Sequence, residues 1–415
     1  MRILQLNNFE AIGGGSERVY QLTTRMLLDK GHDVATLSCG DQSFDSRKTT
    51  VLLSRNGYFS KNPLKTLRNI RDFVYRPDAA EAIEGLVHSF NPDIAHLHIF
   101  YGQLSSAVIA ALRRMQVPCV MTVHEYRLLC PISTLYTQSQ GVCERCATGE
   151  KRNAIALRCN RGSPFASLLS ASESWVRDRY FNYLDHIAHF FMVSEFCRNK
   201  HSEYLPAILQ KSSVLYNFIG DDDIAEVPND VAVGAPFLYA GRLSHEKGVA
   251  LLCSALRDRP QQCLRIAGDG PLAEPLRSEF ADSSNIKFLG KLTSAQLKEE
   301  MRQAKFTIVP SEWYENNPMS VLESFGIGTP VIGADIGGIP ELVQQGSTGI
   351  IFAPSNKASL LQALDDAHGM SGDERNSLGR EALDLIRRHH SEAGYYARLI
   401  AGYSDVIRKF KNQAE

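Results

Sequence analysis

The stretch that decides the fold runs from Pro310 to Glu323 and has the sequence PSEWYENNPMSVLE. It follows a short β-branched run and leads into an apolar helical pattern, so it predicts a strand, a loop and a helix in succession. Asn317 and Pro318 predict the N-cap and the first turn of that helix. Glu323 then lies about one and a half turns into the helix. Glu315 and Glu323 are therefore expected to border one helix N-terminus.

The same succession of strand and helix continues along almost the whole chain, which predicts an α/β fold with parallel sheets. Helical patterns such as 16–31 fall between the strands. The strands are expected at 2–8, 33–39, 93–99, 118–124, 189–194 and 212–217 in the first half, and at 236–241, 263–267, 286–289, 305–310, 330–334 and 349–352 in the second.

Two Rossmann-like domains facing each other across a cleft are expected, because 415 residues exceed what one hydrophobic core usually supports. The boundaries are placed at 1–217 and 218–394, and the segment 217–235 has the Asp, Pro and Gly content of a linker. The C-terminal helix, 395–415, is expected to pack back on the first domain. Ligands of open parallel sheets bind at the carboxyl ends of the strands, so the chemistry is expected in the loops that follow strands.

The overall composition excludes some partners. A net charge of −1 leaves no global positive field, so no nucleic-acid partner is expected. No apolar run is long enough to span a bilayer, and the N-terminus lacks the features of a signal peptide. Nine cysteines without an export signal indicate a reducing compartment, so a cytoplasmic protein is expected.

Anion-binding features follow the first strand of each half. Gly14 and Gly15 lie between a strand and a helix, where glycine lets the backbone approach an anion and the helix N-terminus offers amides. A plain turn is the alternative at this position. Arg242 and Lys247 follow a strand in the second half and are able to converge on one anion. Two solvated surface cations are the alternative for this pair.

At this point the chain resembles the retaining glycosyltransferases of family four, which have the GT-B fold, and among them the bacterial cell-envelope polysaccharide type. The resemblance covers nearly the whole length. It rests on the glycine-rich first loop, the Gly-Arg…Lys-Gly segment at 241–248, and Glu315 and Glu323 with their seven intervening residues. It continues through the segments 328–333 and 337–343.

The resemblance implies roles for individual residues. Arg242 and Lys247 match the pair that holds the donor diphosphate. Glu315 matches the glutamate that contacts the transferred sugar, and Glu323 matches the one that binds the ribose. His124 matches a histidine that borders the reacting sugar, so Glu315 and His124 are the expected catalytic residues. A packed histidine at a strand end is the alternative for His124. The remaining donor-binding residues implied by the resemblance are Gly14, Gly15, Asn316, Asn317, Pro318, Met319 and Ser320.

The implied enzyme is a retaining hexosyltransferase that requires no cofactor for catalysis. Its donor would be a UDP- or GDP-linked sugar, and its acceptor a glycan or a lipid-linked saccharide. A nucleotide-sugar epimerase or another GT-B enzyme is the main alternative, and a non-catalytic sugar-binding subunit is a further one. A dinucleotide-dependent oxidoreductase is disfavoured, because the first loop lacks the G-x-G-x-x-G turn.

A cluster of cysteines follows His124 in an insert at about 130–160. Cys143 and Cys146 have the spacing of a zinc knuckle, and Cys130 and Cys159 flank them. A structural zinc ion is one interpretation, and free thiols are the other.

A basic amphipathic helix is expected at 61–76. Its basic residues are able to meet an anionic membrane surface, at the inner face of the plasma membrane. A solvated face over an ordinary core is the equal alternative. The basic residues are Lys61, Lys65, Arg68, Arg71 and Arg76.

Overall fold

The computed structural model describes residues 1–57, 62–232 and 234–414, and these residues fold into two compact units. Unit 1 contains 1–135, 144–215 and 396–415, and unit 2 contains 136–143 and 216–395. Lys61, which the sequence assigns to the basic helix, and Glu415, at the end of the expected C-terminal helix, lie outside the described residues.

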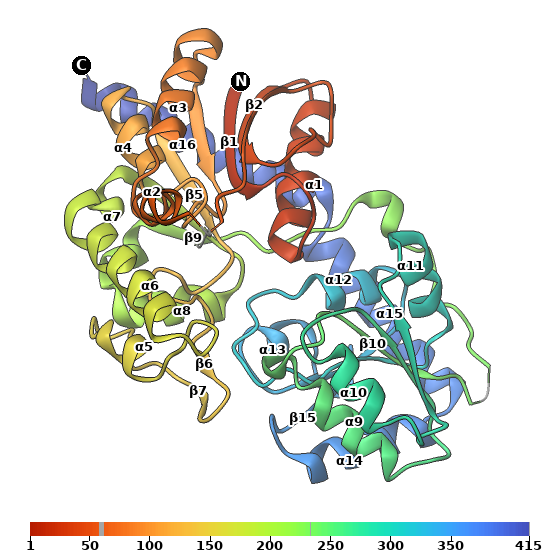
Figure 1. Cartoon of the computed structure of the whole chain (residues 1–415). Helices are drawn as coiled ribbons and strands as arrows, with labels where there is room; N and C mark the ends of the chain where they lie inside the picture. Colours follow the sequence, from red (N-terminus) through yellow and green to blue (C-terminus); the bar gives the residue numbers. More distant parts are fainter. Residues whose placement is uncertain (58–61, 233, 415) are drawn as a thin grey trace. The chain divides into compact units, whose positions relative to one another are not determined.

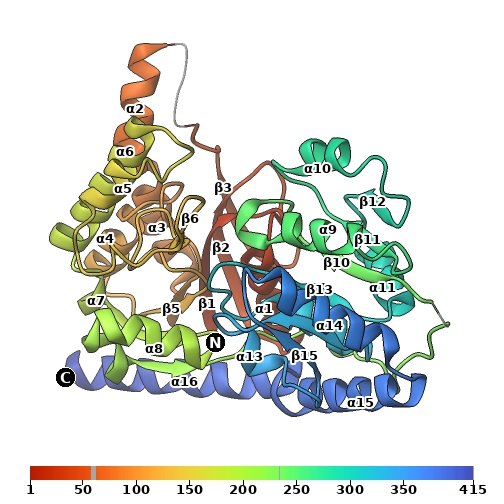
Figure 2. The same ribbon diagram turned by 90° about the horizontal axis from the view of Figure 1, so that it is seen from below.

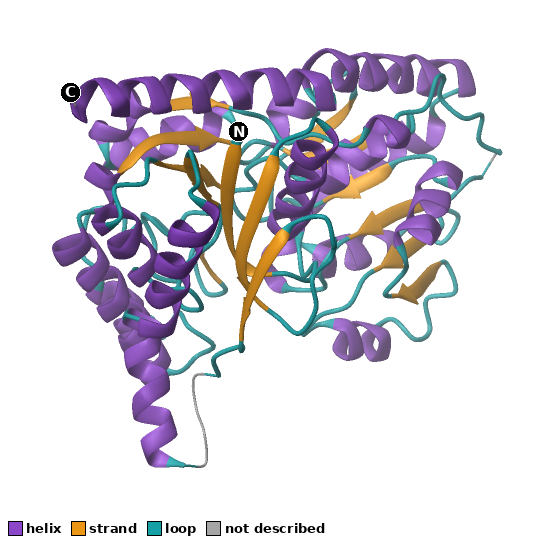
Figure 3. Cartoon of the chain, turned by 90° about the horizontal axis from the view of Figure 1, so that it is seen from above, coloured by secondary structure: helices purple, strands orange, loops and turns teal. Residues whose placement is uncertain are grey.

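Unit 1 is built on a parallel sheet with the strand order β3-β2-β1-β4-β5-β8-β9 (Figures 1 and 3). Its strands are β1 (Arg2–Phe9), β2 (Asp33–Cys39), β3 (Thr49–Leu53), β4 (Ile94–Leu97), β5 (Cys119–Val123), β8 (Ile187–Met192) and β9 (Ser212–Val214). Its helices are α1 (Gly15–Asp29), α2 (Pro63–Val74), α3 (Pro77–Phe90), α4 (Ala107–Arg114), α5 (Arg152–Ala156), α6 (Pro164–Val176), α7 (Tyr183–His186) and α8 (Glu195–Tyr204).

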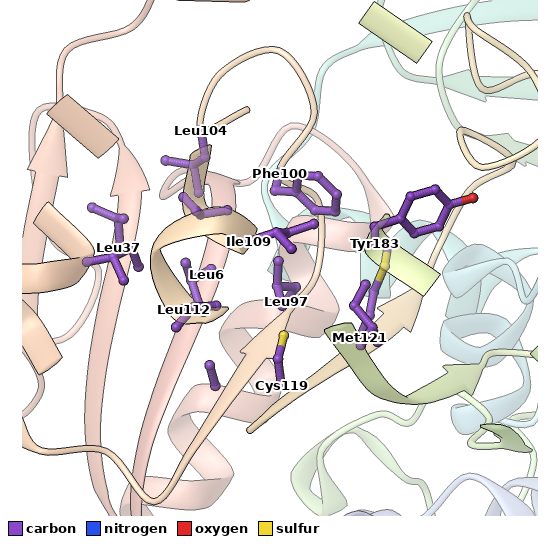
Figure 4. Close-up of a cluster of buried hydrophobic side chains, with 14 of the residues drawn as sticks. Leu6, Leu37, Leu97, Phe100, Leu104, Ile109, Leu112, Cys119, Met121 and Tyr183 are labelled. Atoms are coloured by element: carbon purple, nitrogen blue, oxygen red, sulfur yellow. The ribbon is translucent and has the colours of Figure 1, made fainter. Parts of the chain in front are cut away.

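The two faces of this sheet differ in polarity. Leu4 and Ala95 pair in register and lie on an apolar face with the side chains of α3 and α4. Figure 4 shows this core, where Ile109 and Leu112 of α4 lie over the strands. The adjacent pair, Gln5 and His96, points to the opposite face because side chains alternate along a strand. That face is buried but polar.

The C-terminal helix α16 (Glu392–Ala414) covers part of the polar face. The Tyr403 hydroxyl lies 2.6 Å from Nδ1 of His96. A Cβ atom on Gly402 would come within 2.6 Å of the Phe191 ring, so the helix backbone lies close against β8. Both faces of the parallel sheet are therefore covered, as parallel sheets require.

Unit 2 repeats the same architecture, with a parallel sheet in the order β12-β11-β10-β13-β14-β15. This is the Rossmann order. Its strands are β10 (Phe237–Ala240), β11 (Leu264–Ala267), β12 (Ile286–Gly290), β13 (Thr307–Val309), β14 (Val331–Ala334) and β15 (Gly349–Phe352). Its helices are α9 (Val249–Arg257), α10 (Ala273–Glu279), α11 (Ser294–Gln303), α12 (Met319–Gly326), α13 (Ile339–Leu342), α14 (Lys357–Gly369) and α15 (Gly372–His389). The prediction of two Rossmann-like parallel-sheet halves is confirmed.

The predicted cap of α12 is wrong. Pro318 occupies the N-cap position in an extended conformation, and the helix begins at Met319. The Asn317 side chain instead accepts a hydrogen bond of 3.1 Å from the backbone amide of Asn217. A second hydrogen bond of 2.9 Å runs from the Asn217 side chain to the Asn317 carbonyl. The Asn317 side chain therefore takes part in a tertiary contact with Asn217, which the local sequence does not indicate.

The segment expected to be a linker begins inside unit 2. Phe218 and Ile219 are fully buried, and the amide of Ala225 donates to the carbonyl of Gly326. The insert also differs from expectation, because its hairpin of β6 (Tyr136–Thr137) and β7 (Gly141–Val142) groups with unit 2. Within the described part of the chain, no helix has the length and apolar character needed to cross a membrane.

Candidate functional site

The predicted donor-binding motifs of unit 2 lie where its strand order reverses. β10 pairs with β11 on one side and with β13 on the other, so the connections after β10 and β13 leave the sheet at its switch point. Ligands of open α/β sheets bind at this point. The Glu312 amide donates to the carbonyl of Glu246 at 2.9 Å, so the two loops are joined directly.

Lys247 and Glu315 form the centre of this site. The Lys247 ammonium lies 2.7 Å from Oε1 of Glu315 and 4.8 Å from the Trp313 ring centroid. The Ser311 hydroxyl donates to the same Oε1 at 2.7 Å. Burial alone would raise the pKa of Glu315, but Lys247 and these hydrogen bonds hold that pKa below its usual range. Glu315 is therefore a buried carboxylate that keeps its charge.

Two glycines allow the loops of this site to approach one another. A Cβ atom on Gly248 would lie 1.8 Å from the carbonyl oxygen of Pro310, and one on Gly337 would lie 2.3 Å from the carbonyl oxygen of Glu315. Both have positive φ, where a side chain is strained. The amide of Gly338 donates to the Glu315 carbonyl at 2.7 Å. The loop after β14 thus supports the backbone of Glu315.

The other predicted donor residues surround this pair in unit 2. Arg242 is exposed, and no ion pair to its side chain occurs among the described residues. Asn316 and Asn317 are buried beside Glu315. Glu323 lies in the second turn of α12 and is partly buried. Pro318, Met319 and Ser320 form the N-terminus of α12, and the N-cap residue Pro318 makes no side-chain capping hydrogen bond there.

The glycine loop of unit 1 already holds an anionic group. Gly14 is the N-cap of α1, and Gly15 is its first residue. The carboxyl group of Glu17 accepts hydrogen bonds from the backbone amides of Gly13 and Gly14. Burial nevertheless raises the pKa of Glu17 above its ordinary value. The amides at this helix N-terminus are thus directed at a carboxyl group of the chain itself.

His124 follows β5, is partly buried, and contacts the fully buried His98. Its Nε2 lies 2.9 Å from Nδ1 of His98, and Nε2 of His98 lies 3.2 Å from Oε1 of Gln5. Burial lowers the pKa of His124 to about 3, and it lowers the pKa of His98 well below the usual value. Both rings are therefore neutral at physiological pH. His124 is suited to hydrogen-bond a hydroxyl group, and not to act as a cation.

The four cysteines of the insert are not gathered into one cluster of potential metal ligands among the described residues. Cys146 is buried, and burial with the nearby thiols of Cys130 and Cys159 raises its pKa to about 12. Cys143 belongs to the hairpin that groups with unit 2. Across residues 1–57, 62–232 and 234–414, no three His, Cys, Asp or Glu side chains are placed to hold a metal ion. A structural zinc stays a prediction, which elemental analysis would test.

Sequence reasoning missed several residues that support the site. Ser311 and Trp313 lie inside the quoted stretch, where their closeness to Glu315 was a usable signal. His98 lies in a His-x-His pattern at the end of β4, the strand beside β5. The hydrogen bond of Gly338 had no sequence signal, since it joins two loops.

Comparisons with known proteins agree with this architecture. Residues 13–223 match the family model described as Glycosyltransferase Family 4, and residues 234–384 match the one described as Glycosyl transferases group 1. An uncharacterized 42.6 kDa protein of the cps region of Klebsiella pneumoniae is 24% identical over 343 residues, which are 79% of this chain and 83% of that protein. Glycogen synthase of Mycobacterium tuberculosis is 34% identical over 137 residues, which are 31% of this chain and 33% of that enzyme.

Solved structures share the fold over nearly the whole chain. Sucrose-phosphate synthase of Thermosynechococcus elongatus superposes with a TM-score of 0.73 at 16% identity, covering 98% of this chain and 99% of that one. Anabaena HepE in complex with UDP and glucose superposes with a TM-score of 0.68 at 16% identity, covering 97% and 99%. The chain therefore belongs to Glycosyltransferase Family 4, with a second half of the Glycosyl transferases group 1 type and the GT-B fold.

Proposed function

We propose that this glycosyltransferase moves a hexose-type sugar from a nucleotide-diphosphate donor to a glycan or lipid-linked acceptor, with retention of the anomeric configuration. The observation that carries the proposal is the contact between Lys247 and Glu315 at the switch point of the second sheet. A cation and a carboxylate side by side, in the loops before α9 and α12, suit the two ends of a sugar diphosphate. The cation meets the phosphate, and the carboxylate meets the sugar hydroxyls.

The chemistry explains why a fixed cation is useful. Negative charge grows on the departing diphosphate while the sugar becomes oxocarbenium-like. A hydrogen-bond donor that is already fixed near that charge lowers the activation free energy by ~3 kcal/mol, because it does not have to reorient during the reaction. Lys247 is held in place by Glu315 and lies over Trp313, so its position is set before the donor arrives.

Each proposed role follows from this arrangement. Arg242 and Lys247 bind the diphosphate, Glu315 orients the transferred sugar, and Glu323 binds the ribose. The bond from the anomeric carbon to the phosphate oxygen breaks, and the bond to the acceptor oxygen forms on the same face. The leaving phosphate takes the proton of the acceptor hydroxyl. His124, as a neutral ring, hydrogen-bonds the reacting sugar.

A uridine or guanosine nucleotide is the proposed leaving group. HepE, which shares the fold, is described in complex with UDP and glucose, and this supports a nucleotide-sugar donor.

We further propose that the protein works at an anionic membrane surface, on its cytoplasmic side, through α2. Leu64 and Leu67 of α2 are 77% and 64% exposed, so two large apolar side chains of one helix face solvent. Lys65, Arg68 and Arg71 on the same helix are also exposed. Helix α2 lies beside α6 (Figure 2). Phe165 of α6 is also exposed. Apolar side chains among cations suit an interfacial helix.

The donor site is tested with two variants and a matched control. Wild-type protein is screened by thermal shift against UDP- and GDP-linked sugars, and turnover is measured with the donor that stabilises it most. Lys247→Ala and Glu323→Ala are each expected to lower turnover at least ~100-fold. The first removes a contact to the diphosphate, where negative charge develops, and the second removes a contact to the ribose of the nucleotide. Lys287→Ala removes a comparable charge from the exposed side of β12 and is expected to leave turnover unchanged.

Other outcomes have distinct meanings. Wild-type rates in both variants would refute the site assignment. Conversion of the donor into an epimeric nucleotide sugar, without any acceptor, would identify a nucleotide-sugar epimerase. A product with inverted configuration, seen by NMR at the anomeric position, would refute retention alone.

A further inference from the structure

Three neighbouring strands of unit 1 carry a row of polar side chains on the buried polar face of the sheet. Gln5 belongs to β1, His98 follows β4 and His124 follows β5. The order of the sheet places these three strands side by side. Gln5 and His98 are fully buried, whereas His124 is partly buried. His124 has a proposed role in the reaction, and the two buried side chains connected to it have none so far.

The three side chains form one continuous series of hydrogen bonds. Nε2 of His98 lies 3.2 Å from Oε1 of Gln5, and Nδ1 of His98 lies 2.9 Å from Nε2 of His124. The planes of the two imidazole rings differ by 12°, and the ring centroids are 5.2 Å apart. The N–H bond and the lone pair of an imidazole lie in the ring plane. Nearly coplanar rings therefore suit a linear hydrogen bond between the two nitrogens.

The His98 ring is neutral, so it carries a single N–H. Burial lowers the pKa of His98 well below its usual value, and the charges that His96 and His124 would carry lower it further. The His96 ring lies beside His98, with ring centroids 4.4 Å apart. It does not compete for the nitrogens of His98, because its own two nitrogens hydrogen-bond Tyr403 and Thr122.

The position of that single hydrogen follows from the chemistry of Gln5. The Oε1 atom of an amide only accepts hydrogen bonds, so Nε2 of His98 carries the hydrogen. Nδ1 of His98 is then an acceptor, and Nε2 of His124 must donate to it. Because the His124 ring is also neutral, its Nδ1 carries no hydrogen and is a hydrogen-bond acceptor.

We propose that Gln5 and His98 are positioning residues that fix the tautomer of His124, so that Nδ1 of His124 accepts a hydrogen bond from a hydroxyl group of the reacting sugar. The inference rests on the proposed function for the contact of His124 with the sugar. It adds the direction of that hydrogen bond and the two residues that determine it. A fixed acceptor selects a substituent that is able to donate, and it disfavours an ether oxygen or a fluorine atom at the same position.

The tautomer is measured directly by NMR on the full chain labelled with nitrogen-15 in histidine. Ring nitrogens with and without a hydrogen resonate in well-separated ranges, and His124→Gln identifies the signals of residue 124. In the protein without donor, Nε2 of His124 is expected to carry the hydrogen and Nδ1 to carry none. A hydrogen on Nδ1 would mean that the Gln5 amide presents its NH₂ group to His98, and it would overturn the proposal. This measurement does not depend on the proposed function.

Substitutions of Gln5 test whether it determines the tautomer. Gln5→Met removes the acceptor and keeps the length of the side chain, so the His124 signals should shift to those of mixed tautomers. Gln5→Glu keeps an acceptor and should retain the wild-type signals. Unchanged His124 signals in Gln5→Met would overturn the proposal, and the wild-type tautomer decides it even if this variant does not fold.

Gln21→Met is the matched control. Gln21 is a buried glutamine of α1, and its side chain donates to the Glu10 carbonyl at 2.8 Å. The substitution should lower the melting temperature as the loss of any buried glutamine does, and it should leave the His124 signals unchanged. A shift of these signals in Gln21→Met would show that general destabilisation moves them, which would remove the special role of Gln5.

The direction of the bond to the sugar is tested with deoxy and fluoro analogues of the donor. Dissociation constants are measured by calorimetry without acceptor. The informative position is the one where loss of the hydroxyl weakens binding to wild type but not to His124→Ala. At that position the deoxy and the fluoro analogue should each bind about tenfold more weakly than the parent donor, because fluorine does not donate a hydrogen bond. Gln5→Met should reduce this preference.

The outcomes of the analogue experiment are distinct. A fluoro analogue that binds like the parent donor at the informative position would overturn the proposal, because His124 would then be a hydrogen-bond donor. Absence of any such position would overturn the contact between His124 and the sugar, whereas the tautomer result stands by itself. Binding of UDP or GDP alone, measured on the same samples, reports on the donor site, so failure of the donor assignment is recognised separately.

Discussion

The Tyr403 hydroxyl makes a hydrogen bond of 2.6 Å with Nδ1 of His96, and both residues are fully buried. Tyr403→Phe should lower the free energy of unfolding by about 1–2 kcal/mol, because it leaves a buried imidazole nitrogen without that partner. Tyr396 makes a similar bond of 2.8 Å to His32 at a more exposed position. Tyr396→Phe should therefore change stability by less than about 0.5 kcal/mol. Urea denaturation of both variants measures the difference, and equal losses would contradict this account.

Single residues also show how far spacing within a motif reaches. Glu315 and Lys247 were singled out from separate motifs, and the structure brings them to 2.7 Å. The sequence instead predicts that Lys247 and Arg242 act together on one anion, because both follow the same strand. Contact with a group 68 positions away depends on which strands are neighbours, and spacing within one motif does not contain that information.

At the scale of elements, the loops after β10 and β13 meet at Gly248. Gly248→Ala places a Cβ atom 1.8 Å from the Pro310 carbonyl, so the loops must separate. Gly346 has a similar φ of 71°, but a Cβ atom there meets no atom within 4 Å. Gly346→Ala should therefore show only the backbone strain of ~1–2 kcal/mol. Gly248→Ala should lower the melting temperature further and abolish donor binding, as thermal shift with UDP would show.

A result in which both alanine variants lose the same stability would contradict the close approach. It would mean that φ alone, and not the Pro310 contact, requires glycine at position 248.

Element order was predictable to a large extent, whereas element ends were not. The strands expected at 189–194 and 212–217 are found at Ile187–Met192 and Ser212–Val214. Apolar periodicity indicates that a buried strand is present. It does not indicate where the strand ends, because a strand ends where its hydrogen bonds to the neighbouring strand stop. The cap of α12 failed for a related reason, since Asn217 recruits the side chain of Asn317.

At the scale of the whole molecule, membrane contact through α2 is the property to test. Full-length protein should sediment with vesicles of phosphatidylglycerol and phosphatidylcholine, and much less with phosphatidylcholine alone, because the helix is basic. Leu64→Ser with Leu67→Ser should reduce binding to the anionic vesicles at least about fivefold. Leu209→Ser changes a leucine that is 46% exposed outside α2 and should have no effect. Unchanged binding of the double variant would contradict the proposed surface.

Taken by itself, the sequence determined the α/β class, the succession of strands and helices, and the loops that carry the donor motifs. It could do so because hydrophobic periodicity, glycine-rich turns and motif spacing are local properties of a chain. Only the tertiary structure decided that Lys247 contacts Glu315, that the Glu17 carboxyl group lies at the amides of the first glycine loop, and that the Tyr101 hydroxyl has no hydrogen-bond partner among the described residues. Those facts depend on burial and on neighbours from distant strands, and both arise only when the sheet is assembled.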